Sequence, residues 1–447
     1  MEIIETKEKK TAFSPFRFII LGFLGLVLLG ALLLMLPISS KSGVVTPFNE
    51  ALFTSTSAAC VTGLVVHDTA TYWSVFGQAI ILVLIQIGGL GVITVSALVV
   101  LILGKRITLK QRNTLQEAFA AHEVGGIVRL MLFILKGTAV FETLGVLSML
   151  PVFCKDYGLR GIWLSVFHSV SAFCNAGFDI LGTENAKFQS LTSYGSNVAI
   201  NITVMLLIII GGIGFLTWED IFKKKFRFKQ YRLQSKLILI TTAFLIIAPA
   251  LLFFICDYSK LGLKDRVLYS LFQSVTTRTA GFNTGDFSAL KDYSRAVVII
   301  LMLIGGSTGS TAGGMKTTTF AVLILNLFSV FRRKNDTEIF GRRIDNSIVK
   351  NAATILMMYF TLFFVSALAI SGLEGIPFAT CLFETASAIG TVGLTLGITT
   401  SLGVISQIIL IILMFLGRVG GLTLIFATFA NSGIVTSKLP QEKITVG

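Results

Sequence analysis

The sequence has few charged residues for its length. Of its 447 residues, 13% are Asp, Glu, Lys or Arg and 54% are hydrophobic, and the mean hydropathy is +0.83. Soluble domains carry about a quarter charged residues, so this composition excludes a soluble globular chain and predicts a polytopic membrane protein. The net charge of +14 does not indicate nucleic-acid binding, because that function needs a basic face on a soluble domain.

Cysteine and histidine are also scarce. The five cysteines show no paired spacing, and no metal-binding motif accompanies the three histidines. These absences exclude a disulfide scaffold and argue against a zinc site. No catalytic constellation of side chains is found, so we expect no enzyme activity and no cofactor on this chain.

Most of the 37 Lys and Arg residues lie in short loops between apolar runs. When alternate loops are grouped, 23 of these residues fall on one side and nine on the other. The richer side includes both termini, so we predict that both termini are cytoplasmic and that the protein lies in the cell membrane. The first apolar run, 18–38, is too long for a signal-peptide core and lacks a cleavage site, so we expect a retained spanning helix.

One short pattern occurs four times along the chain. Each copy has an apolar residue and Phe, a stretch of Ser, Thr and Ala, and a Gly followed by Leu or Phe. The copies are residues 52–64, 166–178, 271–282 and 382–394. A second signature follows each copy, as GGLG at 88, GGIG at 211, GGST at 305 and GGLT at 420. Two motifs repeated in one order indicate four tandem units of about 110 residues.

Each unit contains two apolar segments long enough to span a membrane and one segment of about a dozen residues that is too short. The first segments are 16–38, 126–153, 236–257 and 347–371, and the second are 74–103, 194–222, 293–331 and 401–432. The short segments begin and end on the extracellular side, so they are re-entrant. Irregular backbone at membrane depth is tolerated where it lines a wet cavity, so four such loops predict a pore.

The predicted fold class is therefore an all-α polytopic membrane protein, with eight spanning helices and four re-entrant pore helices around a pseudo-fourfold axis. The chain divides into an N-terminus at 1–15, units at 16–104, 105–222, 223–331 and 332–432, and a tail at 433–447.

The residues before each repeat glycine differ between the units, whereas the glycine recurs. The candidate ion-binding residues are Cys60, Val61, Thr62 and Gly63; Cys174, Asn175, Ala176 and Gly177; Arg278, Thr279, Ala280 and Gly281; and Gly390, Thr391, Val392 and Gly393. Side-chain ligands would have to match between units, so we predict that backbone carbonyls form a filter. Glycine permits the positive φ that aligns carbonyls, and carbonyl rings replace the hydration shell of a monovalent cation. The alternative is that the glycines only allow tight turns or close packing.

A polar interruption occurs in the second apolar segment of the third unit. Residues 305–319 read GGSTGSTAGGMKTTT and resemble a phosphate-binding loop, but Met315 breaks the GxxxxGK[ST] spacing. This composition predicts a helix broken at the bilayer midplane, whereas the other three second helices keep apolar residues after their GG pair and are expected to stay helical. The candidate gate residues are Gly305, Gly306, Ser307, Thr308, Gly309, Ser310, Thr311, Ala312, Gly313, Gly314, Lys316 and Arg418.

Two of these gate residues are charged. Arg418 lies mid-helix in an apolar span, where a charge is costly and by default functional; the alternative is a purely structural bridge. For Lys316, a gating role and a snorkelling role both remain open.

Other charges lie near the predicted filter and helices. Arg278 is expected to point behind the filter towards an acid, with Glu384 as a candidate partner. Arg129 and Lys136 are expected to have structural roles, with Lys136 paired to Glu142. The acids that follow three of the filter segments either draw cations to the vestibule or are solvated loop residues: Asp68, Asp179 and Asp286.

This design resembles the Trk/Ktr/HKT superfamily of potassium transporters. The resemblance covers residues 16–432 and rests on the four units, the filter glycines and the broken third second helix. The chain is most similar to the bacterial Ktr-type pore-forming subunit, because no additional helix pair precedes the first unit. The resemblance implies potassium uptake, with K⁺ as the transported ion and Na⁺ as a candidate coupling or activating ion. A serine at the first filter position marks sodium-permeable relatives, and Gly63 stands there.

The resemblance also implies partners and a gating mechanism. It implies a homodimer on a cytosolic ring of nucleotide-binding regulatory proteins, with loops 223–236 and 332–343 and the tail after 432 as candidate contacts. It implies that Arg418 forms a positive barrier below the filter, and that the loop at 305–319 blocks the pore and moves on activation. Two other functions stay open: a sodium or unselective monovalent-cation transporter, and a membrane enzyme that uses Lys316 on phosphate substrates.

Overall fold

Four long apolar helices form the frame of the computed structural model, which describes residues 15–103, 107–119, 126–225, 227–421, 423, 440 and 442. These helices are α1 (Pro15–Leu34), α7 (Ile127–Tyr157), α11 (Leu233–Cys256) and α15 (Asn346–Glu374). Each is long and apolar enough to cross a membrane. Each lies where the sequence predicts the first spanning helix of a unit.

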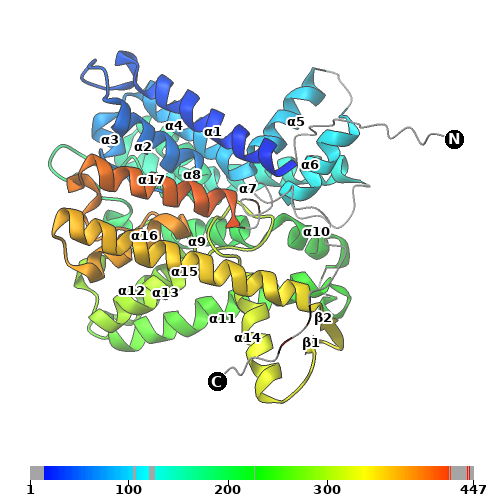
Figure 1. Cartoon of the computed structure of the whole chain (residues 1–447). Coiled ribbons are helices and arrows are strands. Elements are labelled where there is room, and N and C mark those ends of the chain that lie inside the picture. The colour runs from blue at the N-terminus through cyan, green and yellow to red at the C-terminus, as the bar shows by residue number, and fades with distance from the viewer. Residues whose placement is uncertain are drawn as a thin grey trace.

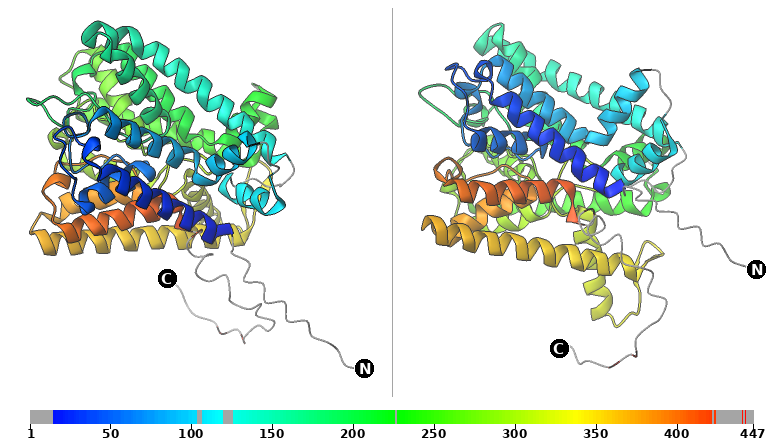
Figure 2. Two further views of the ribbon diagram at one scale, coloured as in Figure 1. Left: turned by 90° about the horizontal axis from the view of Figure 1, so that it is seen from above. Right: turned by 45° about the horizontal axis from the view of Figure 1, so that its top comes forward.

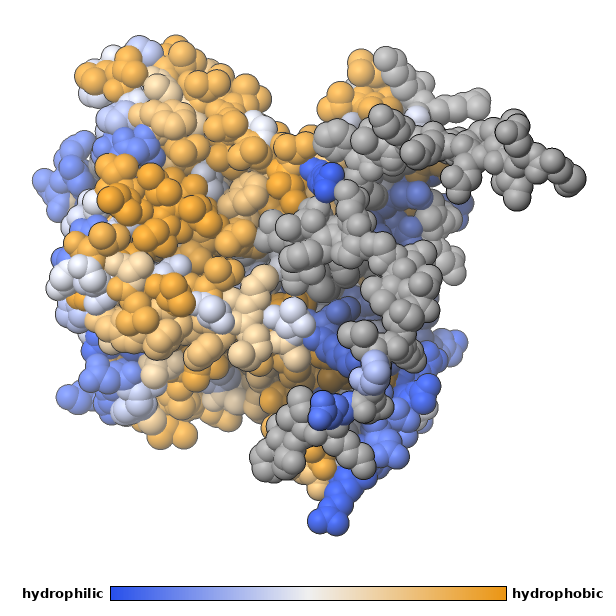
Figure 3. All heavy atoms as spheres, in the orientation of Figure 1, coloured by the Kyte–Doolittle hydropathy of each residue, from blue (hydrophilic) through white to orange (hydrophobic). Residues whose placement is uncertain are grey.

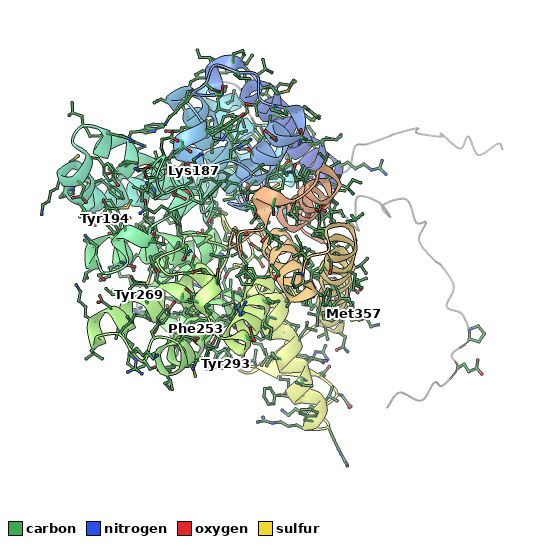
Figure 4. All side chains as sticks on the ribbon, turned by 90° about the vertical axis from the view of Figure 1, so that its left-hand side faces the viewer. Lys187, Tyr194, Phe253, Tyr269, Tyr293 and Met357 are labelled. Atoms are coloured by element: carbon green, nitrogen blue, oxygen red, sulfur yellow. The ribbon has the colours of Figure 1, made fainter. Side chains whose placement is uncertain are left out.

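A short helix follows each frame helix. These helices are α2 (Phe48–Ala59), α8 (Arg160–Phe173), α12 (Leu263–Thr276) and α16 (Phe378–Gly390), with 12 to 14 residues each. At 1.5 Å per residue they cannot cross a bilayer, so they are re-entrant as predicted. Viewed from the end of the molecule in Figure 4, the four units follow one another around a common centre.

The second helices of the units are interrupted. They comprise α4 (Val75–Leu90) with α5 (Val92–Ile102), α9 (Val198–Gly212) with α10 (Phe215–Lys224), α13 (Asp292–Leu303) with α14 (Thr317–Phe331), and α17 (Val404–Val419). The axis turns by 96° between α4 and α5 and by 98° between α9 and α10. The expectation that only the third second helix breaks is therefore wrong. What distinguishes the third unit is a loop of thirteen residues, 304–316, between its two helices.

Glycines in the left-handed region produce these breaks. Gly91 has φ 88°, Gly214 has φ 91° and Gly420 has φ 87°. A helix cannot continue through such a residue, whatever the hydropathy of its neighbours. The apolar side chains after the GG pairs therefore do not keep these segments straight.

The structure shows that the second repeated signature is aligned differently between the units than the sequence predicts. A glycine three residues before each break packs against the pore helix of its own unit, where a Cβ would lie under 3.0 Å from a carbonyl oxygen: Gly88 against Ala59, Gly211 against Phe173, and Gly417 against Ile389. The shared pattern is thus G-x-x-G, at 88–91, 211–214 and 417–420. The fourth copy begins at Gly417 rather than at the predicted GG pair, and Arg418 occupies its second position.

Hydroxyl groups fasten three pore helices to their frame helices. Ser55 donates to the Val27 carbonyl at 2.7 Å, Ser169 to the Glu142 carbonyl at 2.7 Å, and Ser274 to the Ile246 carbonyl at 2.6 Å. The equivalent Thr385 donates within its own helix, to the Cys381 carbonyl. These bonds hold the short helices at a fixed depth in the molecule.

The remaining elements lie at the two ends of the bundle. They are α3 (Thr69–Tyr72), α6 (Leu109–Phe119), the antiparallel strands β1 (Thr337–Ile339) and β2 (Arg342–Ile344), and 3₁₀ turns at 37–39, 192–194, 228–230, 287–289 and 399–401. Figure 1 shows α3 at one end, and α6, α10 and the β-hairpin at the other. Figure 2 shows the frame helices running between these ends. The described parts of the basic loops, which lie at α6, α10 and the β-hairpin, thus share one end.

The outer surface of the frame helices is apolar. Leu21, Leu29 and Leu32 of α1 are at least half exposed, as are Phe244 and Leu251 of α11. Figure 3 shows such residues covering the middle of one face, with hydrophilic residues gathered towards opposite edges. An apolar belt between polar ends is the surface that a lipid bilayer solvates, so the protein is a multi-pass membrane protein.

The packing at Gly88 yields a testable prediction. Gly88→Ala would place a Cβ against the Ala59 carbonyl, so we expect a loss of about 1–3 kcal/mol in stability. Gly25 in α1 has no atom within 4 Å of a Cβ position and provides the control, Gly25→Ala. Thermal unfolding of the purified variants in detergent measures the difference. Equal melting temperatures for the two variants would contradict this packing.

Candidate functional site

The four repeat glycines form a closed ring. A Cβ on Gly63 would lie under 3.0 Å from the Ala176 carbonyl oxygen, and one on Gly177 would lie as close to that of Ala280. The series continues from Gly281 to the Val392 carbonyl, and from Gly393 back to the Thr62 carbonyl. The residues predicted from four distant parts of the chain are therefore brought together around one centre.

The backbone of each ring segment has the same conformation. The residue two positions before each glycine also has a positive φ: Val61 57°, Asn175 60°, Thr279 63° and Thr391 50°. A positive φ is a genuine outlier for a β-branched residue, and such strain gathers at functional sites. Two positive-φ residues separated by one ordinary residue recur in all four units although the side chains differ.

Hydrogen bonds from the pore helices hold this conformation. The backbone N–H between the two positive-φ residues donates to a pore-helix carbonyl in each unit: Thr62 to Ser57, Ala176 to Ser171 and Val392 to Ser387, each at 2.8 Å, and Ala280 to Thr276 at 3.0 Å. The hydroxyls of these same Ser and Thr residues also bond the ring segment. Ser57 and Ser387 accept from the ring glycine, and Ser171 and Thr276 donate to the carbonyl that follows it.

These four hydroxyl residues were missed by the sequence analysis. The available signal was a Ser or Thr six residues before the glycine in three units, and five before it in the shorter third copy. The ring presents carbonyl groups at the negative ends of four helices. This arrangement can bind a dehydrated monovalent cation.

The loop 304–316, which we call the gate loop, lies directly beneath the ring. A Cβ on Gly313 would meet the Thr391 side chain, and one on Gly314 would lie 2.9 Å from the Gly390 carbonyl oxygen. The Thr311 hydroxyl donates to the Phe173 carbonyl at the end of α8, at 3.1 Å. The loop therefore packs against the ring segment of the fourth unit and against the C-terminal end of α8.

The second helices of the second and fourth units hold the gate loop by its backbone. The N–H groups of Ser307 and Thr311 donate to the carbonyls of Gly212 and Gly211 at 2.9 and 3.2 Å. In return, the Phe215 N–H at the start of α10 donates to the Gly309 carbonyl at 2.7 Å. Gly314 donates to the Gly417 carbonyl of α17 at 3.1 Å. The break at Gly214 is thus what brings α10 into contact with the loop.

Arg418 joins the gate loop to the first unit. Its guanidinium donates to the Thr311 carbonyl of the loop and to the carbonyls of Gly88 and Gly89 at the end of α4. The side chain thereby links three units below the ring. The structure places Arg418 as a bridge, and a positive charge at this depth is compatible with the predicted barrier as well.

Lys316 is turned towards the loop itself. Its Nζ donates to the Ala312 carbonyl at 2.8 Å and lies 3.4 Å from the Gly313 carbonyl oxygen. The residue is only partly buried. A cavity of about 330 Å³ lies on the far side of the loop from the ring, and both Lys316 and Arg418 line it.

Two predicted ion pairs are wrong. Arg278 is 6% exposed and lies against Ile208 and Ile209 of α9, and no acid within the described ranges pairs with it. Its proposed partner Glu384 accepts hydrogen bonds from Thr395 and Thr399 instead.

The predicted Lys136–Glu142 pair is also not formed. The Glu142 carboxyl lies beside the Gln86 side chain, and Lys136 makes no ion pair with any residue that the structure describes.

The acids after the filter segments have different environments. Asp68 is 4% exposed; its carboxylate accepts from the N–H groups of Thr71 and Phe188, both at 2.9 Å, and so ties the first unit to the second. Asp179 accepts from the Leu181 N–H at 3.3 Å. Desolvation and the charge of Asp68 raise the pKa of Asp179 to about 7. Asp286 is an exposed acid that caps a 3₁₀ turn, as a solvated loop residue would.

Comparison with known proteins gives consistent matches over nearly the whole chain. The TrkH family model, described as a cation transport protein, matches residues 6–438. The "Potassium/sodium uptake protein NtpJ" of Enterococcus hirae is 40% identical, over 99% of this chain and 100% of its own. The "Ktr system potassium uptake protein B" of Bacillus subtilis is 38% identical, over 98% of each.

A solved structure shares the fold. The potassium transporter TrkH from Vibrio parahaemolyticus superposes with a TM-score of 0.73, over 94% of this chain and 86% of that one, at 19% sequence identity.

The environment of Asp179 predicts a pH dependence. An unfolded aspartate titrates near pH 4, so the folded state, with its raised pKa, binds the proton more tightly. The free energy of unfolding should therefore fall as the pH rises from about 4 to about 7. We expect Asp179→Asn to remove this decline and to be more stable than the wild type at pH 7.5.

Thermal unfolding at several pH values checks this expectation, with Asp286→Asn as the control at an exposed loop acid. Parallel pH profiles for the wild type and Asp179→Asn would show that this carboxyl is not desolvated as described.

Proposed function

Since the chain belongs to the TrkH family of cation transport proteins, we propose that it is the ion-translocating subunit of a potassium uptake system in the cell membrane. The chain is a transporter and not an enzyme. The observation that carries the proposal is the closed ring of Gly63, Gly177, Gly281 and Gly393 with its aligned backbone. Carbonyl oxygens from four units that meet around one centre suit a monovalent cation without its water shell.

The gate loop supports a regulated pore. Hydrogen bonds from the second and fourth units hold it below the ring, and Arg418 of the fourth unit ties it to the first. A closed state of this kind needs a conformational change before ions pass, and the Gly-rich loop has the backbone freedom for that change. Arg418 would act in the closed state both as a bridge and as a positive barrier.

The coupling ion and the orientation belong to the same proposal. A relative named for potassium and sodium uptake supports a role for Na⁺ as a coupling or activating ion. The excess of Lys and Arg in alternate loops supports cytoplasmic termini. The tail at 433–447, like the N-terminus at 1–14, lies outside the described residues except for positions 440 and 442.

We propose further that the protein works as a homodimer on a cytosolic nucleotide-binding ring. Two basic segments at one end of the bundle support this, because α10 ends in Lys223 and Lys224, and β2 carries Arg342 and Arg343. A sodium or unselective transporter of the same architecture is the second candidate. It predicts that sodium competes effectively with rubidium for uptake.

Removing the bridge should open the pore. Arg418→Ala deletes the donors that hold Thr311 to the first unit, and charged hydrogen bonds are worth about 1.5–3 kcal/mol each. We expect rubidium-86 uptake into liposomes holding the purified protein alone to rise about tenfold. Deletion of 307–316 should act in the same direction. Arg129→Ala is the matched control for loss of an arginine from a membrane segment.

If folded Arg418→Ala and the loop deletion both transported no more than the wild type, the loop would not be a gate.

Filter selectivity depends on the missing side chain at the ring. Gly63→Ser would bring a Cβ to 2.5 Å from the Ala176 carbonyl oxygen and distort the carbonyl ring. We expect sodium to compete with rubidium at several-fold lower concentration than in the wild type. Gly262→Ser, at a position with no atom within 4 Å of a Cβ, is the control. Unaltered sodium competition in Gly63→Ser would count against the filter.

A further inference from the structure

Each pore helix carries a buried polar side chain at the same position, directly after a phenylalanine. The polar residues are Thr54, His168, Gln273 and Glu384, and each is at most 2% exposed. The fourfold design therefore buries an equivalent polar group in each of the four short helices. Only one of the four is a carboxyl group.

The surroundings of Glu384 differ from those of its three equivalents. The Thr395 hydroxyl donates to its carboxylate at 2.8 Å, and the Thr399 hydroxyl donates as well. In contrast, Thr54 Oγ1, His168 Nε2 and Gln273 Nε2 have no hydrogen-bond partner among the described residues. A carboxylate has only acceptor oxygens, so two hydroxyl donors offset part of the cost of burying its charge.

No basic side chain among the described residues neutralises the Glu384 carboxylate. None of the ion pairs of the described residues includes Glu384. The buried arginine of the third unit, Arg278, lies against α9 and does not reach it. The buried carboxylate thus has no counter-ion among the residues that the structure describes.

Glu384 lies beside the upper end of the fourth filter segment. Thr395 follows Gly393 by two residues, and Thr399 begins the next 3₁₀ turn. The carboxylate therefore adjoins the chain that leaves the ring on the side away from the gate loop. Buried charges are poorly screened by salt, so the field of this carboxylate would act on a cation held in the ring.

We propose that the Glu384 carboxylate is a fixed counter-charge that raises cation occupancy of the ring and so sets the affinity of uptake. The inference rests on the proposed pore function. Glu384 is a positioning residue in this scheme, because the ion contacts backbone carbonyls and feels the carboxylate through its field. The field adds to that of the four helix C-termini, which have the same sign.

A purely structural role makes a different demand on the residue. If Glu384 only fixes residues 394–399, its side chain must provide hydrogen-bond acceptors at position 384 itself. As a counter-charge, it must only be negative and lie close to the ring. The fourfold arrangement separates these roles, because Gln273 provides an equivalent position for the charge in the third unit.

The test measures initial rates of rubidium-86 uptake into proteoliposomes against rubidium concentration. Three proteins are compared with the wild type: Glu384→Gln, Gln273→Glu, and the double variant that moves the charge. We expect Glu384→Gln to raise the half-saturating concentration about three- to tenfold, with a maximal rate within about twofold of the wild type. The double variant should reverse at least half of this increase in half-saturating concentration, measured on a logarithmic scale.

Thermal unfolding confirms that each variant is folded, and His168→Glu replaces Gln273→Glu as the second charge position if the double variant is not. An unchanged half-saturating concentration in Glu384→Gln overturns the proposal. So does a folded double variant with the same affinity as Glu384→Gln. If the wild type itself shows no saturable rubidium uptake, the pore function fails and the counter-charge falls with it.

Discussion

The approach of four main chains at the ring of Gly63, Gly177, Gly281 and Gly393 is the constraint on which the rest of the structure depends. The space between neighbouring chains excludes even a Cβ atom, so each unit must offer glycine there. Each must also hold a second positive-φ residue two positions earlier, at a cost in strain. The pore helices offset that strain with a carbonyl and a hydroxyl from one Ser or Thr. The repeats conserve backbone geometry, while their side chains are free to differ.

That freedom gives the four units separate roles. The G-x-x-G pattern lets a second helix touch its pore helix and then turn, and the turn at Gly214 brings α10 to the gate loop. In the fourth unit Arg418 stands in this pattern where the first two units have glycine, and it reaches carbonyls of the loop and of the first unit. A symmetric ring, the proposed ion site, is thus combined with asymmetric contacts that hold the loop 304–316 in place.

Much of this architecture could be predicted from the sequence, because the repeated motifs reflect backbone geometry that each unit needs locally. The four frame helices, the four re-entrant helices and the ring residues follow from hydropathy and from glycines in register. The bends at Gly91 and Gly214 could not be predicted. The apolar residues around these glycines are typical of one continuous helix, and hydropathy does not reveal the backbone angle φ of a glycine. Arg418 is recognisable in the sequence as a costly charge, but its partners lie 107 and 330 residues away along the chain. Pairing Arg278 with Glu384 failed because hydroxyls, not a cation, satisfy that carboxylate.

The most direct test of the central claim is the position of the bound ion. Crystals of the purified protein grown with rubidium would locate it by anomalous scattering. The account predicts a peak at the centre of the ring, surrounded by main-chain carbonyl oxygens from the filter segments that end in Gly63, Gly177, Gly281 and Gly393. A ring without a peak in a structure that binds rubidium elsewhere, such as in the cavity beside Arg418, would contradict it.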